Sequence, residues 1–183
     1  MAQHHHQQQS NQWQGGKEFS KQDDIVEMIL EDHKPLKELI KIMKDSDKDL
    51  AAREDAFAEF APLLVCHAKP EEQSLYVYMK GNEELREDGF EGDVEHQLAD
   101  QLCEEIMRTE DPDEIGAKIK VLAELVEHHI EEEEEDLLPE FRKNSEAQER
   151  MQLGEKFLAL KVQYLEKGGQ ETPHESDRNS EIH

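Results

Sequence analysis

The stretch VEHHIEEEEEDLLPEF, residues 126–141, places two histidines one residue before five glutamates and an aspartate in a segment with helical periodicity. From Val126, steps of three and four residues lead to His129, then to Glu133, and then to Leu137. Residues at this spacing share one face of an α-helix. We therefore predict that His129 and Glu133 point inward with the apolar side chains. A charge run usually faces solvent, and this is the prediction for Glu131, Glu132, Glu134 and Glu135.

The same spacing places one histidine on the apolar face of each of three further predicted helices. A lone inward histidine is usually a hydrogen-bonded core residue, but several inward histidines and glutamates would be costly to bury without a common partner. Imidazole and carboxylate together suit iron, manganese or zinc. The sequence therefore predicts a metal site built from His33, His67, Glu71, His96, His129 and Glu133. His128 lies on a more marginal face, and both a ligand role and a surface role stay open for it.

Helical periodicity runs through the chain between two polar ends, and no segment alternates as a strand would. Short connections favour antiparallel neighbours, so we predict an all-α fold, an up-down antiparallel four-helix bundle with a short fifth C-terminal helix. The predicted domain covers 20–167, and we expect disordered tails at 1–19, which is rich in His and Gln, and at 168–183. The predicted helices cover about 21–44, 49–80, 92–108, 112–143 and 145–165, with a loop at 81–91.

Helix boundaries were predicted from capping residues and from proline. Ser20 and Ser145 are predicted N-caps, and Asp111 is a third, followed by Pro112 at the first helical position. Pro35, Pro70 and Pro139 fall inside helical patterns, so local kinks are expected near the site.

Composition restricts the partners of this 183-residue chain, whose formal net charge is −25. Such a charge repels phosphate backbones and anionic lipid, so neither nucleic acid nor a membrane surface is expected as a partner. Cys66 and Cys103 lie in apolar stretches and are expected as free thiols. The sequence has neither a signal-peptide pattern nor an apolar run of membrane-spanning length, and a cytoplasmic location is the expectation.

Four stretches in order carry a resemblance to a known family: ILEDHKPLKELI (29–40), HAKPEEQSLY (67–76), VEHQLADQL (94–102) and VEHHIEEEEEDLLPEF. Over about residues 22–165 the chain resembles the hemerythrin-like domains with the HHE cation-binding pattern. The resemblance implies a four-helix bundle holding two non-haem Fe ions with an oxo or hydroxo bridge. It further implies that Glu71 and Glu133 bridge the irons and that the terminal ligands are His33, His67, His96 and His129.

Asp100 is a departure from the oxygen carriers of that family, which have a fifth histidine ligand one turn after the position of His96. Six-coordinate iron needs more donors than the six predicted residues and one bridging oxygen supply, by roughly two positions on octahedral counting. Asp100 is therefore either an additional ligand or a residue that contacts the ligands.

Two functions from different classes remain after the sequence analysis. The favoured one is a non-enzymatic di-iron protein for oxygen or iron binding, sensing or storage, whose partner is dioxygen or another small diatomic or peroxide ligand. The alternative is a di-iron redox enzyme acting on peroxide or nitric oxide. A third reading is an acidic helical bundle that holds no metal. The sequence does not indicate a protein partner.

Overall fold

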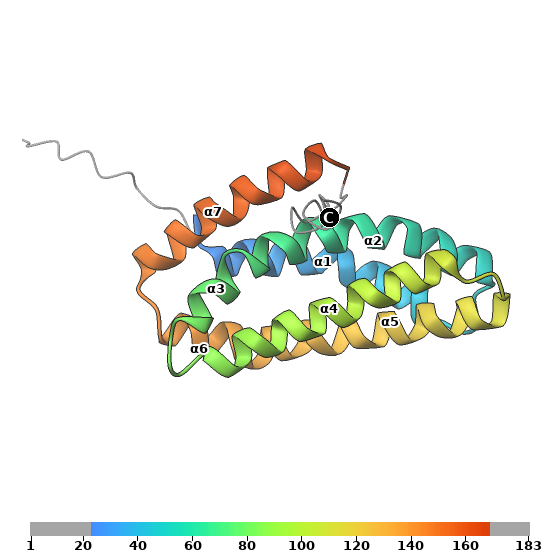
Figure 1. Ribbon diagram of the computed structural model, residues 1–183, viewed down its shortest axis with the longest axis horizontal. Helices are drawn as coiled ribbons and strands as arrows, with labels where there is room; N and C mark the ends of the chain where they lie inside the picture. Colours follow the sequence, from blue (N-terminus) through green and yellow to red (C-terminus); the bar gives the residue numbers. More distant parts are fainter. Residues whose placement is uncertain (1–22, 169–183) are drawn as a thin grey trace, which may run out of the picture.

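The computed structural model describes residues 23–168, and every regular element in that range is helical (Figure 1). The predicted all-α fold is confirmed. The predicted tails, except for Gly168, and the predicted cap Ser20 lie outside the described residues. Asp24 caps the first helix by accepting from the Val26 N–H at 2.9 Å. The elements are α1 (Ile25–Lys44), α2 (Leu50–Glu72), α3 (Leu75–Lys80), α4 (Arg86–Arg108), α5 (Pro112–Glu132), the π-helix η2 (Glu133–Leu137), α6 (Leu138–Lys143) and α7 (Ala147–Glu166).

Four helical rods form the bundle, namely α1, α2 with α3, α4, and α5 with η2 and α6 (Figure 1). Helix α1 packs on α2 and α5, and α4 packs on α3 and α5. Helix α7 is 20 residues long, the length of α1, and lies against α1 and α2. Within residues 23–168, no helix combines the length and apolar character needed to cross a lipid bilayer.

The predicted helix 49–80 is broken in the structure, because α2 ends at Glu72 and α3 begins after Ser74. The Ser74 hydroxyl donates to the Pro70 carbonyl oxygen at 2.6 Å, and the Ser74 backbone leaves the helical region. A serine side chain that takes a carbonyl four residues back competes with the helical hydrogen-bond ladder. The break redirects the chain, so that Tyr76 on α3 lies buried inside the bundle.

The predicted loop 81–91 is also wrong, because α4 begins at Arg86. Gly89 and Gly92 weaken the sequence signal for a helix, since each glycine costs about 1 kcal/mol relative to alanine in a helix interior. Close packing explains both residues. A Cβ on Gly92 would lie only 2.4 Å from Cζ of Tyr76, so α3 and α4 approach each other at these glycines.

The predicted helix 112–143 has the right ends but contains a π-helical segment, η2. Pro139, just after it, has no N–H to give to the carbonyl of Glu135, and its ring would clash with that carbonyl in a regular helix. The wider turn accommodates the proline, and π-bulges often occur at functional sites. It brings Glu134 as well as Glu133 toward the inner side of the bundle.

One of the two predicted caps of α5 and α7 is confirmed and the other is wrong. Asp111 caps α5 as predicted, with Pro112 in the first turn. Ser145 does not cap α7, because its hydroxyl donates to the Phe141 carbonyl oxygen at 2.6 Å. Glu146 is the N-cap instead, in a capping box with Glu149.

Two apolar clusters fill the bundle, and the buried polar residues lie between them. One cluster gathers around Leu36, Leu64 and Val126, and the other around Ile29, Leu75 and Leu138. In α1, for example, His33 falls between a residue of each cluster. The apolar packing on both sides thus encloses a polar layer that crosses the bundle.

Candidate metal centre

The polar layer contains all six residues that the sequence predicted to point inward. None is more than 5% exposed. Donor atoms gather in two groups, and within each group one atom from every residue lies within 4.8 Å of the others. The groups are His33, His67 and Glu133, and His96, His129 and Glu71.

Each buried glutamate lies between one histidine of each group. The two ends of a single carboxylate can bind two ions, so this placement suits a bridging role. For Glu133, Oε2 lies 3.2 Å from Nε2 of His33 and Oε1 lies 3.6 Å from Nε2 of His129. For Glu71, Oε2 lies 3.4 Å from Nε2 of His67 and 3.8 Å from Nε2 of His96.

A second set of carboxylates contacts the opposite nitrogen, Nδ1, of each histidine. Every contact joins two different rods, and the contacts run from α1 to α2, α2 to α4, α4 to α5, and η2 back to α1. We call this set, Asp32, Glu72, Glu95 and Glu134, the carboxylate ring. Its distances to Nδ1 are 3.4 Å (Asp32 to His67), 3.1 Å (Glu72 to His96), 2.5 Å (Glu95 to His129) and 3.0 Å (Glu134 to His33).

The carboxylate ring fixes which imidazole nitrogen carries hydrogen. A carboxylate only accepts, so at His33, His96 and His129 the Nδ1–H donates to it, and Nε2 of the neutral ring is left with a lone pair. Histidines that bind metals commonly make this contact through the nitrogen that does not bind the metal. The ring therefore prepares three of the four imidazoles to donate electron pairs to a cation, and Asp32, 3.4 Å from Nδ1 of His67, lies on the same side of the fourth.

Several atoms at the centre have no hydrogen-bond partner among the described residues. They are Nε2 of His33, both imidazole nitrogens of His67, both carboxylate oxygens of Glu71, Oε2 of Glu133 and Oδ2 of Asp32. Burying an unpaired polar group costs a few kcal/mol, and an unpaired charge costs more. The unpaired atoms are the nitrogen and oxygen donors that a transition-metal cation takes, so the residues present fit a metal centre.

The electrostatics of the centre favour a positive charge at this position. Burial and the neighbouring charge of Glu133 raise the pKa of Glu71 well above its ordinary value. Burial, reinforced by nearby His129, lowers the pKa of His96 well below its ordinary value, which keeps this imidazole neutral. The raised pKa favours the protonated form of Glu71, at a position where a cation would take the place of the proton.

Tyr76 is a residue of the centre that the sequence analysis missed. Its hydroxyl donates to Oε1 of Glu133 at 2.6 Å and lies 3.4 Å from Nε2 of His129. Its ring packs beside His96, with 5.2 Å between centroids. Burial and the charge of Glu133 raise the pKa of Tyr76 well above its ordinary value, so it remains a neutral donor. In the sequence Tyr76 reads only as an apolar helix residue, because the break at Ser74 carries no strong signal.

One prediction for the acidic run was wrong, namely that Glu134 faces solvent. Glu131, Glu132 and Glu135 are exposed as predicted. Glu134, in contrast, has only 25% of its side chain exposed and contacts both His33 and Lys37, the latter at 2.7 Å. The π-helical turn explains the difference.

The two residues left open as additional ligands both lie outside the two donor groups. The side chain of His128 is 65% exposed and pairs with Glu132 at 3.2 Å. The carboxylate of Asp100 contacts Nζ of Lys69 at 2.5 Å, and 26% of its side chain is exposed. Asp100 thus binds a lysine of α2 at the edge of the centre.

The sequence was also compared with known proteins. The family described as the hemerythrin HHE cation binding domain matches residues 24–141, a range that contains all six inward residues and the carboxylate ring. Searches of curated proteins and of solved structures gave no match. The family match and the two donor groups together indicate a metal-binding protein. The chain belongs to the hemerythrin family, defined by its HHE cation-binding domain.

Proposed function

We propose that the polar layer binds two non-haem iron ions and that the protein binds, senses or stores oxygen or iron without catalysing a reaction. The proposed ligands are His33, His67, Glu71, His96, His129 and Glu133. The observation that carries the proposal is the position of both glutamates between the two donor groups. One ion in either group would leave the other group's histidines unpaired, whereas two ions use every donor.

Iron is supported by the donor set together with the open coordination positions that the proposed function needs. Each ion would receive two imidazole nitrogens and one oxygen from each of two shared carboxylates, which makes about four protein donors per ion. Iron and manganese favour about six donors, and zinc in a closed structural site takes four. An ion of the first kind keeps coordination positions for a small molecule such as dioxygen, which the proposed function needs.

Tyr76 is the observation that favours the second candidate, a redox enzyme acting on peroxide or nitric oxide. Reduction of such a molecule consumes protons, and the Tyr76 hydroxyl lies 3.4 Å from Nε2 of His129. Its raised pKa makes it a poor acid, so it is better suited to donating a hydrogen bond than to releasing its proton. The non-enzymatic function therefore stands first.

Anaerobic reconstitution with ferrous iron, followed by elemental analysis, tests the metal assignment. We expect two irons per chain; one tightly held zinc and no bound iron would contradict it. Repeated addition of peroxide to the reduced protein separates the two functions. A binding protein consumes peroxide once per centre, and an enzyme supplied with a reductant continues to consume it.

A further inference from the structure

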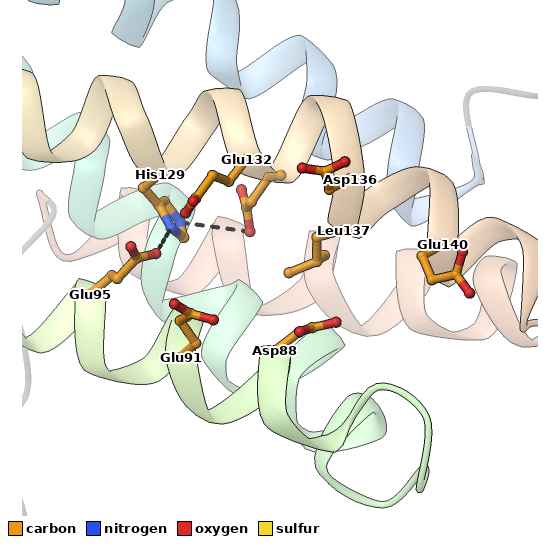
Figure 2. A pocket seen from close by; sticks show the side chains of 10 residues that line it. Asp88, Glu91, Glu95, His129, Glu132, Asp136, Leu137 and Glu140 are labelled. Carbon is orange, nitrogen blue, oxygen red and sulfur yellow. Dashed lines mark hydrogen bonds and ion pairs between the residues drawn. The ribbon is translucent and has the colours of Figure 1, made fainter.

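A pocket of about 380 Å³ opens between the first turns of α4 and the segment formed by the end of α5, η2 and α6. Figure 2 shows Glu91, Glu95 and Asp88 on the α4 side and Glu132 and Asp136 on the other, around one space. The inner end of the pocket is lined by His129 and Glu133, which belong to the candidate centre. The pocket therefore connects the surface with the proposed metal ligands.

The lining of this pocket is strongly acidic. Seven of its ten residues are aspartate or glutamate, and none is lysine or arginine. Within residues 23–168, no lysine or arginine forms an ion pair with Asp88, Glu91 or Asp136. Like charges gathered around a hollow with low-dielectric walls repel one another and concentrate a negative potential there. Such a potential attracts cations and repels anions.

Burial of the lining residues increases with depth. Glu91 and Asp136 are exposed at the mouth, Asp88 and Glu95 are half-buried, and Glu133 is buried at the inner end. Oε2 of Glu133 has no hydrogen-bond partner among the described residues. A buried carboxylate oxygen of this kind requires a positive partner. The acidic lining thus ends at a buried carboxylate, one oxygen of which has no hydrogen-bond partner among the described residues.

The pocket beside α1 and α7 offers a useful contrast. It is lined by Asp32, which contacts His67, but also by Lys161, which forms an ion pair with Asp32. A lysine at this position opposes the approach of a cation. Of these two pockets, the acidic one is therefore better suited to the passage of a metal ion.

We propose that the acidic pocket is the route by which divalent cations enter the centre from solvent. The proposal rests on the proposed metal-binding function and adds how the ion arrives. The mouth acids Glu91 and Asp136 collect a hydrated cation, and half-buried Glu95 guides it inward. His129 and Glu133 then bind it first. Because Glu95 also contacts Nδ1 of His129, the residue that guides the ion also orients the histidine that receives it.

The test compares rates of metal uptake by the metal-free full-length protein. The variant Asp88→Asn/Glu91→Gln/Asp136→Asn removes three charges from the pocket and leaves every proposed ligand in place. The control Glu54→Gln/Asp55→Asn/Glu59→Gln removes three charges from exposed positions on α2, outside the pocket. Cobalt(II), which is stable in air and visible by absorbance, is mixed with each protein in a stopped-flow instrument at low and high salt.

We expect the pocket variant to take up cobalt about tenfold more slowly at low salt, since steering of this kind changes association rates by tenfold or more. Added salt should slow the wild type and the control more than it slows the pocket variant. The amount of cobalt bound at equilibrium should be the same in all three proteins.

Equal uptake rates in the pocket variant and the control would overturn the proposed route while leaving the metal centre intact. A lower amount of bound cobalt at equilibrium in the pocket variant would also overturn it, because the acids would then hold metal instead of guiding it. A wild type that binds no cobalt and no iron at equilibrium would overturn the proposed function itself, and the two failures are thus distinguishable.

Discussion

The Nε2 atoms of His96 on α4 and His129 on α5 lie 3.0 Å apart in the buried centre. Each histidine uses Nδ1 to contact a carboxylate, Glu72 for the first and Glu95 for the second. Two neutral imidazoles in this arrangement would direct lone pairs at each other. Either a proton or a cation must lie between them.

We expect a proton to lie between these imidazoles in the metal-free protein and metal binding to release it. Burial lowers the pKa of His129, but the charges of Glu133 and Glu95 outweigh burial, and the net pKa is raised. The pKa of Glu71 is raised as well. We expect metal uptake to release about one to two protons per chain and to become tighter as pH increases. Calorimetric titration in buffers of different ionisation enthalpy measures this number, and a heat that is independent of the buffer would contradict the prediction.

The adjacent histidines His128 and His129 provide a matched pair for the ligand assignment. His129→Ala should lower the iron content of reconstituted protein sharply, because His129 belongs to a donor group. His128→Ala should leave it unchanged, because this side chain is exposed to solvent. Elemental analysis of both variants gives the comparison, and equal losses of iron would refute the inward assignment of His129.

The carboxylate ring should affect metal affinity without binding metal. Glu134→Ala removes the acceptor that orients His33, and loss of such an acceptor typically weakens metal binding about 10- to 100-fold. Glu135→Ala is the control, since this neighbouring side chain is exposed. Competition with a chelator of known affinity measures the difference. Equal affinities in the two variants would show that Glu134 does not position the ligand.

Glu71→Gln should stabilise the metal-free protein at neutral and higher pH. The folded pKa of Glu71 lies well above its ordinary value of 4.5, so wild-type stability from this group is fully present below about pH 4.5. This contribution to stability is lost as the pH increases toward the pKa of Glu71 in the folded protein. Glutamine does not titrate, so the variant should melt a few degrees higher than the wild type at pH 8, and the gap should shrink toward pH 5. A gap that stays constant with pH would show that Glu71 is not the titrating group.

Gly92→Ala should destabilise the protein and displace Tyr76. The added Cβ would lie 2.4 Å from Cζ of Tyr76, so the ring or the helix must move, at a cost of about 1–3 kcal/mol for overpacking. Gly116→Ala, in α5, is the control. A Cβ at position 116 would make only ordinary van der Waals contacts, the nearest with Nη1 of Arg53 at 3.4 Å. The Gly116→Ala substitution should therefore stabilise the helix by up to about 1 kcal/mol. Thermal melts compare the two, and a Gly92→Ala variant as stable as the wild type would contradict the tight packing.

The sequence predicted the fold well wherever one apolar face repeats at the helical period. It failed where a local contact overrides that period. The hydroxyl of Ser74 ends α2 by binding the Pro70 carbonyl, and Pro139 follows a π-helical turn that periodicity cannot reveal. Gly92 lowers the helix signal, yet the structure needs it because Tyr76 occupies the space of a side chain.

The gathering of the six inward residues was predictable for the same reason, since each continues an apolar face of its own helix. The carboxylate ring was not predictable in this way. Asp32 and Glu95 read as polar positions beside a histidine, and their partners lie on other helices. Those contacts depend on how two rods are aligned with each other. The residue spacing within one helix carries no information about that alignment.

The carboxylate ring also reveals an internal repetition in the chain. In the first half, an acid is followed directly by histidine at 32–33, and the pattern His-x-x-x-Glu-Glu follows at 67–72. The second half repeats both patterns in the same order, at 95–96 and at 129–134. The α1–α2 and α4–α5 hairpins are therefore two similar half-sites. One ring contact lies inside each hairpin, whereas the other two contacts and both buried glutamates join one hairpin to the other. A motion that separates the hairpins would therefore open the centre while leaving each half-site assembled.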